Sequence, residues 1–246
     1  MPHKLDINLV ANILGVTQTT LRRWDANGVL SARRDHSTSH RYYFDNDIED
    51  FLSTNFKYLN NVAINWAFSK DDPTSVTLSR FYCQDSSIFK ARLTKLETEL
   101  LTDPKLRESF SLVTSLVGEI GNNSFDHNIG NWPGVPGIFF GYSIPERKIV
   151  LADRGQGVLA TLRNVRSSLS NDKDALIVAF TEVISGRSLE ARGNGLKYVK
   201  KVITEYAMNL SFQSGKDEAI INRGFIVEEV KNNLRGCFVV LDYKNL

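Results

Sequence analysis

The 246-residue chain is 42% hydrophobic and carries a formal net charge of +2, with 30 basic against 28 acidic residues. Its length and apolar content suit one large domain or, better, one medium and one small domain. The nearly balanced charge argues against avid, sequence-independent coating of DNA. The two cysteines, Cys83 and Cys237, are too few for a disulfide framework and lack metal-ligand spacing. With no signal peptide and no apolar run near the ~20 residues that span a bilayer, we expect a cytoplasmic protein without membrane contact.

The N-terminal residues predict two short helices joined by a tight turn. Gly15 ends the first helix, Thr17 is placed to cap the second, and Gly28 stops it. The apolar residues on the inner faces of the two helices are Leu9, Val10, Ile13, Leu14, Leu21 and Trp24. This pattern is typical of a helix-turn-helix.

A hairpin-like wing is predicted over residues 33–44, and a short helix over residues 47–52 is expected to pack under it. Residues 5–52 resemble the MerR and excisionase type of winged helix-turn-helix domain. The resemblance rests on Leu21-Arg22-Arg23-Trp24-Asp25, Gly28 and Arg41-Tyr42-Tyr43. It implies a homodimer whose second helix enters the major groove of double-stranded DNA while the wing holds the flanking backbone.

The same resemblance implies which side chains touch DNA. Gln18 and Thr19, near the start of the second helix, are expected to contact base edges. The residues expected to contact phosphates are Arg22, Arg23, Arg33, Arg34, Arg41 and Tyr42. Between residues 22 and 41, five arginines face only Asp25 and Asp35, which gives a local excess of positive charge. The alternative is a small helical module that docks a protein partner.

Residues 53–106 predict two helices between the N-terminal domain and the rest of the chain. Apolar spacing places one helix around residues 59–66, broken at Asp71-Asp72-Pro73, and another around residues 89–100. These helices form either a connector or dimerisation region, or a layer that packs on the following domain.

Residues 107–246 alternate between helical and strand patterns. An apolar helix pattern from Phe110 to Ile120 precedes two strand-like runs at 137–142 and 147–152, which are joined as a hairpin. A helix that opens at Gly195 precedes further strand-like runs at 209–212 and 236–243. The order predicts an α+β fold, a two-layer α/β sandwich with helices covering one face of a mostly antiparallel sheet.

Three motifs in this region point to an ATP site. Glu119 and Asn123 lie one helical turn apart and point the same way, as a general base beside a magnesium ligand requires. The motif Asp153-Arg154-Gly155-Gln156-Gly157 ends a strand, and Gly193-Asn194-Gly195-Leu196 opens a helix. Glycines let the backbone approach a ligand so that successive amides face phosphate oxygens. In the alternative reading, Asn123 only caps its helix and the glycines only form turns.

Together these motifs resemble the GHKL superfamily of ATP-binding proteins, which includes DNA gyrase B, MutL, the ninety-kilodalton heat-shock chaperones and the sensor histidine kinases. The resemblance runs from about residue 107 to the C-terminus and implies the Bergerat-type ATP-binding fold. It implies that Glu119 orients the attacking group, that Asn123 binds Mg²⁺ and that Asp153 accepts a hydrogen bond from the adenine amino group. The implied glycine motifs are Gly155 with Gly157 and Gly193 with Gly195, with a mobile lid between them.

Departures from the family pattern refine these roles. The order Asn123-Ser124-Phe125-Asp126 is closer to MutL and gyrase than to sensor kinases, and it implies that Asp126 steadies the site. His127 either lines the site or packs as a satisfied histidine. Arg187, Arg192 and Lys197 are each either a ligand of the γ-phosphate or a solvated charge. None of the four histidines lies in a helix before the ATP domain, which argues against histidine autophosphorylation.

Three functions are compatible with these features. A DNA-reading domain beside an ATP site favours a DNA-binding regulator in which Mg²⁺-dependent ATP hydrolysis controls DNA or partner binding. The second is a protein kinase or anti-sigma-type switch that acts on a separate protein partner. The third is a nucleotide-binding interaction protein without turnover.

Overall fold

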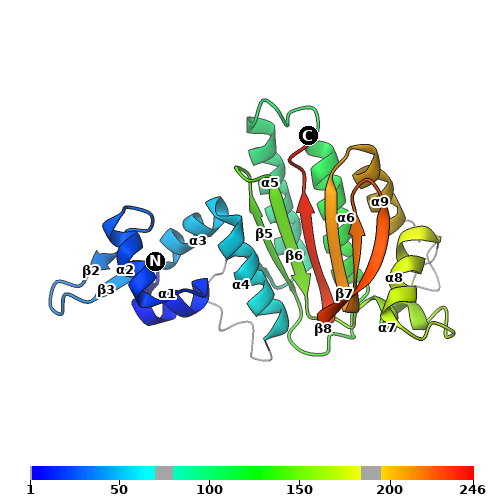
Figure 1. Ribbon diagram of the computed structural model, residues 1–246, viewed down its shortest axis with the longest axis horizontal. Coiled ribbons are helices and arrows are strands. Elements are labelled where there is room, and N and C mark those ends of the chain that lie inside the picture. The colour runs from blue at the N-terminus through cyan, green and yellow to red at the C-terminus, as the bar shows by residue number, and fades with distance from the viewer. Residues whose placement is uncertain (1, 70–79, 184–194) are drawn as a thin grey trace.

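The computed structural model describes residues 2–69, 80–183 and 195–246. It is a mixed helix-and-sheet structure, in which a small N-terminal module lies at one end of a larger domain built on a five-stranded sheet (Figure 1). In these three ranges, no helix is both long and apolar enough to cross a membrane.

The N-terminal module is a helix-turn-helix with a small sheet. Its elements are β1 Lys4–Asp6, α1 Ile7–Leu14, α2 Gln18–Ala26, β2 Arg33–Arg34, β3 Arg41–Phe44 and α3 Asp45–Thr54. The Thr17 hydroxyl accepts a hydrogen bond from the Thr20 amide at 3.1 Å, and the left-handed residue Gly15 ends α1. The predicted helices and turn are therefore confirmed. Strand β1, which pairs with β3, is absent from the prediction because three residues carry too little pattern.

The connecting segment packs on both faces of the large sheet. Its elements are α4 Phe56–Phe68, β4 Tyr82–Cys83 and α5 Ser86–Thr102. The two predicted helices are present, whereas the two-residue strand β4, which pairs with β5, was not expected. The predicted break at residues 71–73 lies outside the described residues.

The large sheet has the strand order β4-β5-β6-β8-β7, and all neighbouring strands are antiparallel. Its remaining strands are β5 Ile138–Ser143, β6 Lys148–Asp153, β7 Asn209–Ile221 and β8 Phe225–Asp242. The helices of this domain are α6 Phe110–Asp126, α7 Val158–Arg163, α8 Asp172–Thr181 and α9 Gly195–Glu205. Strand β6 lies between β5 and β8, so Asp153 at its end is near the middle of the sheet.

Alternate side chains of the central strands enter two different cores. Ile149 and Leu151 of β6 belong to the core that contains α5, α6 and α9, whereas Val150 and Ala152 pack with α4 and the N-terminal module. The prediction that helices cover one face only is therefore wrong. Helix α4 lies on the opposite face, between the module and the sheet (Figure 1). The reason is visible in β6, which is apolar on both faces and thus needs cover on both.

The β7–β8 hairpin is longer than the strands predicted at 209–212 and 236–243. A register shift around Gly215 bends the hairpin, and its distal half packs on α8, where the rings of Phe180 and Phe225 lie 5.8 Å apart. The outward residues of this half include Glu228 and Glu229, both exposed, so polar sequence hid the strand pattern. The hairpin and α8 form one packed unit.

The segment expected to be a mobile lid is partly helical. Helices α7 and α8 fill its first half, and Leu176 and Phe180 of α8 are fully buried. The described part of the expected lid is therefore anchored in the core. Arg187, Arg192, Gly193 and Asn194 lie outside the described residues.

Candidate functional site

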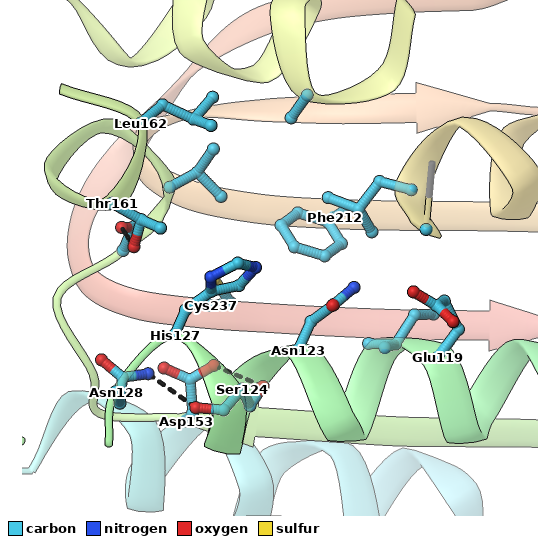
Figure 2. A pocket seen from close by; sticks show the side chains of 16 residues that line it. Glu119, Asn123, Ser124, His127, Asn128, Asp153, Thr161, Leu162, Phe212 and Cys237 are labelled. Atoms are coloured by element: carbon cyan, nitrogen blue, oxygen red, sulfur yellow. Dashed lines mark hydrogen bonds between the residues drawn. The ribbon is translucent and has the colours of Figure 1, made fainter. Parts of the chain in front are cut away.

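A cavity opens between α6, the end of β6 and the helices α7 to α9. Figure 2 shows Glu119 and Asn123 of α6 followed by His127 at the C-cap of that helix, with Phe212 of β7 and Cys237 of β8 across from them. Their spacing of four residues puts the three side chains on the same face of the helix. The expected carboxylate and carboxamide therefore line the same cavity.

Asp153 lies on the β6 side of this cavity with 2% of its surface exposed. Its carboxylate accepts hydrogen bonds from the Ser124 hydroxyl and the Gly155 amide, each at 2.8 Å. Burial raises the pKa of Asp153, although the Ser124 hydroxyl and the amides of Gly155 and Cys237 oppose that effect. Burial and the neighbouring Asp153 also raise the pKa of the Cys237 thiol. A further hydrogen-bond donor from a ligand would stabilise the ionised carboxylate.

The loop after Asp153 is fixed by Asn128. The Asn128 carboxamide donates to the Ser124 carbonyl at 2.7 Å and accepts from the Gln156 amide at 2.9 Å. The Gln156 side chain donates to the His127 carbonyl at 2.8 Å. These bonds tie the end of α6 to the glycine-containing loop, so the two motifs form one structural unit.

Two glycines stand where a larger residue would not fit. Gly157 has a φ of +81°, and a Cβ atom there would lie 2.5 Å from the Arg235 carbonyl oxygen. A Cβ atom on Gly195 would overlap the Glu119 carboxylate, which places the start of α9 directly against the proposed base. Both positions lie in the cavity wall, so the backbone itself forms part of the site.

Most of the predicted ligand-binding residues meet in this cavity. The predicted residues that line it are Glu119, Asn123, His127, Asp153, Gly157, Gly195 and Leu196. Gly155 does not line the cavity, but its amide supports Asp153. Asp126 does not line it either: the side chain is exposed at the end of α6, one position away from the inward-facing series. Lys197 is absent from the lining and borders a separate groove between α8 and α9.

Nine residues that line the cavity were not among the predicted site residues. Five of them carry an apolar side chain: Ile120, Val158, Leu162, Ala179 and Phe212. The other four are Ser124, Asn128, Thr161 and Cys237. Ser124 and Asn128 carried a signal, because Ser124 neighbours the Glu119 motif on α6 and Asn128 follows two residues after the end of that helix. Phe212 and Cys237 reach the cavity only through strand pairing, which a linear pattern does not contain.

The predicted DNA-contacting residues divide into two groups. Arg22 and Arg23 project from α2 into solvent, and within the described part of the chain neither forms an ion pair. Arg22 donates to Gln18 at 3.1 Å, and Thr19 is exposed beside them. These four side chains therefore share one accessible helix surface.

The wing arginines are paired with carboxylates of the module. Arg33 forms an ion pair with Asp47, Arg34 lies 3.7 Å from Asp25, and Arg41 donates to Asp25 at 2.8 Å. The Arg41 guanidinium is the main cause of the lowered pKa of Asp25. These contacts give the three arginines a structural role, which the expectation of simple phosphate contacts did not include.

Tyr42 packs on the small sheet of the N-terminal module. Its ring meets Phe44 edge-on at 5.6 Å, and the Lys4 ammonium lies 4.6 Å from the ring centre. The half-buried ring therefore stabilises the small sheet at the base of the wing.

Comparison with known proteins identifies the N-terminal module. Residues 5–55 match the family model described as MerR HTH family regulatory protein. The N-terminal module is a MerR-type helix-turn-helix domain. This class of domain implies DNA binding by a regulator.

One curated relative is similar over a short segment. The chain is 33% identical over 58 residues to the type II methyltransferase M.Eco47II of Escherichia coli. That match covers 24% of this chain and 14% of the methyltransferase. The similarity is therefore confined to a small part of both proteins.

Proposed function

We propose that this protein is a DNA-binding regulator whose C-terminal domain binds ATP, so that nucleotide state controls binding to DNA or to a partner. The MerR-type domain supports the first half, and its family resemblance supports a homodimer on DNA. One observation carries the second half: Glu119 and Asn123 of α6 line the same cavity as the buried Asp153, with Gly157 and Gly195 in its wall.

Each group in the cavity has a role in this proposal. The buried Asp153 offers the acceptor that the adenine amino group needs, and Ser124 holds that acceptor in place. Helix α9 begins at Gly195. The free amides at its N-terminus and the positive end of its dipole favour the binding of phosphate there. Gly193, Asn194 and Leu196 belong to the same motif. The arrangement supports a GHKL-type site.

Magnesium fits the donor set as a phosphate-bound ion. Among the described residues, no group of three or more His, Cys, Asp or Glu side chains could form a protein cage for a metal. Mg²⁺ is commonly held by one or two protein oxygens together with phosphates and water. The Asn123 carboxamide supplies one such oxygen beside Glu119. Bound there, the ion would offset the charge of the phosphates.

Glu119 is the proposed general base. Its half-buried carboxylate lies against Gly195, at the end of the cavity away from Asp153 (Figure 2). A base at the phosphate end can orient or deprotonate a water molecule for attack on the γ-phosphate. If a partner hydroxyl took the place of water, the same site would act as a kinase.

The test follows the label of γ-phosphate-labelled ATP with Mg²⁺ in the parent and in Glu119→Gln. We expect the parent to release free phosphate, and the variant to bind ATP with a turnover rate about 10²–10⁴-fold lower. Glu108→Gln, an exposed carboxylate before α6, is the matched control and should retain the parent rate. Equal turnover in the parent and Glu119→Gln would refute the role of Glu119. Label on a protein instead of free phosphate would favour the kinase.

A further inference from the structure

Strand β6 is bound at both of its ends to helix α4. The Glu146 carboxylate, just before β6, accepts a hydrogen bond from the Phe56 amide at the start of α4 at 2.6 Å. Arg154, just after β6, donates through Nε to the Trp66 carbonyl in the last turn of α4 at 2.7 Å. An anion therefore sits at the helix N-terminus and a cation at its C-terminus, where each is favourable.

Arg154 also stacks on Trp66. Its guanidinium carbon lies 4.7 Å from the centre of the indole ring, and Nη2 makes a second hydrogen bond to the Trp66 carbonyl. The side chain is thus held by a planar fork and a ring face together. Such a contact fixes the position of the last turn of α4 relative to the residue 154 backbone.

That backbone belongs to the cavity loop. Arg154 stands between Asp153, which lines the cavity, and Gly155, whose amide donates to Asp153. The side chain of Arg154 leaves the sheet on the α4 side, while Asp153 faces the α6 side. One tripeptide therefore contacts the candidate ligand site and the helix on the opposite face.

Helix α4 is continuous with the core of the DNA-binding module. The ring of Tyr58 on α4 meets Trp24 of α2 at 5.2 Å and Phe51 of α3 at 5.5 Å. Leu59 of α4 is fully buried in the core that the module shares with β6. A displacement of α4 must therefore move or repack the inner side of α2, whose outer side carries Arg22 and Arg23.

We propose that Arg154 is a positioning residue that couples occupancy of the cavity to the placement of the DNA-binding helix. The inference rests on the proposed nucleotide function. A ligand that bonds to Asp153 and reorders the following glycine loop changes the backbone that holds Arg154. The Trp66 carbonyl follows that change, while Glu146, which lies outside the loop, keeps the other end of α4 in place. A change in the bound nucleotide is thereby transmitted to α2 through the Arg154 side chain and helix α4.

The test measures DNA affinity with and without a non-hydrolysable ATP analogue and Mg²⁺. The probe is a duplex selected from a random pool with the full parent chain, and analogue affinity is measured separately. We expect the analogue to change the DNA Kd of the parent at least about fivefold, the lower end of ordinary allosteric coupling. Arg154→Ala should bind the analogue within about twofold of the parent, yet its DNA Kd should change less than about twofold on adding the analogue.

Arg147→Ala is the matched control. Arg147 lies at the opposite end of β6, where its side chain donates to the Leu246 carbonyl and forms an ion pair with Asp103. It should retain the full response to nucleotide. If Arg154→Ala is too unstable to assay, Arg154→Lys keeps the charge but loses the fork, and it should retain less than half of the parent response.

The outcomes separate the coupling from the proposed function. A parent that binds no analogue refutes the nucleotide function and the coupling with it. A parent that binds the analogue with an unchanged DNA Kd, or an Arg154 variant that keeps the full response, refutes the coupling alone. Hydrogen exchange of the α4 amides gives a second readout: nucleotide should alter their exchange in the parent and leave it unaltered in Arg154→Ala.

Discussion

Asp25 and Asp35 of the DNA-binding module carry pKa shifts opposite to that of Asp153 in the cavity. In the module, the Arg41 guanidinium lowers the pKa of Asp25, and the Ser37 hydroxyl and amide hold the pKa of Asp35 at about 2. In the cavity, burial raises the pKa of Asp153 despite its hydrogen bonds. The ionised forms of Asp25 and Asp35 are therefore stabilised by hydrogen-bonding and charged partners within the module. In the cavity, a hydrogen-bond donor from a ligand would further stabilise the ionised carboxylate of Asp153.

This difference indicates how each region meets its partner. The wing arginines already have carboxylate partners, so DNA must either leave those pairs intact or replace them. Among the described residues, no cation is one of the main groups that shift the pKa of Asp153, and this acceptor thus favours a neutral or positively polarised donor such as an amino group. The comparison predicts effects that differ in size, salt dependence and pH dependence.

The largest effect is expected at Asp153. Asp153→Ala should lower ATP affinity about 100-fold, because it removes a charge-assisted hydrogen bond to the base and leaves its donors unpaired. Asp126→Ala is the control, since that exposed carboxylate does not line the cavity. Binding of a fluorescent ATP analogue measures both. Equal ATP affinity in Asp153→Ala and the parent would refute the assignment of Asp153 to the ATP site. A large loss of affinity in Asp126→Ala would show that Asp126 also contributes to ATP binding.

The next effect separates the two groups of arginines. Replacing Arg22 and Arg23 with Ala should reduce the slope of log affinity against log salt by about 2, because two phosphate contacts are lost. Replacing Arg33 and Arg34 should reduce it by about 1 or less, since Asp47 neutralises Arg33 whereas Asp25 is shared between Arg34 and Arg41. Anisotropy titrations over a salt series measure the slopes. Equal reductions would show that the wing pairs open on DNA, whereas unchanged binding in the α2 variant would favour a protein-docking module.

The predictability of the two regions differs for a physical reason. The helix-turn-helix was readable because its determinants are local: Thr17 caps α2 three residues before the amide it serves, and Gly15 ends α1. The internal pairing of Arg41 with Asp25 was not readable, because 16 residues separate them and the fold closes the gap. Composition counted those arginines as surplus charge, although the structure uses them within the module.

The cavity was predictable where a helix sets the spacing. Glu119, Asn123 and His127 recur every four residues, so a single helix brings them together. Phe212 and Cys237 come from strands whose partners no spacing reveals. Helix α4 itself was predicted, and packing on the following domain was one of its two expected placements. Its apolar face indicated burial, but not which face of the sheet it covers. Asp126 does not line the cavity, and its expected role in steadying the site stays a prediction.

A smaller effect tests how Ser124 holds Asp153. Ser124→Ala should lower ATP affinity about fivefold, which corresponds to the net contribution of about 1 kcal/mol of one ordinary hydrogen bond, and Ser124→Thr should restore it. The loss of this donor should raise the pKa of Asp153 further. Because the amino group binds the ionised carboxylate, ATP affinity should rise with pH through that pKa, and the rise should move to higher pH in Ser124→Ala. Titrations from about pH 5 to about pH 9 measure it. An unshifted profile would exclude Asp153 as the titrating group.

The smallest effect is expected at Arg41, and it concerns stability. Asp25 has a lowered pKa in the folded state, so its contribution is complete above the ordinary carboxyl pKa and is lost as pH falls through the folded value. Arg41→Ala should therefore reduce the free energy of unfolding by about 1 kcal/mol at neutral pH and by much less in acid.

Asp153 provides the opposite case for the same measurement. Its folded pKa is raised, so its contribution is complete below the ordinary carboxyl pKa and is lost as pH rises through the folded value. Asp153→Asn should consequently be more stable than the parent at neutral pH and should lose that advantage in acid. Urea unfolding at neutral pH and at about pH 3 compares the two variants. If both responded to pH in the same direction, the module and the cavity would not differ in how they stabilise their carboxylates.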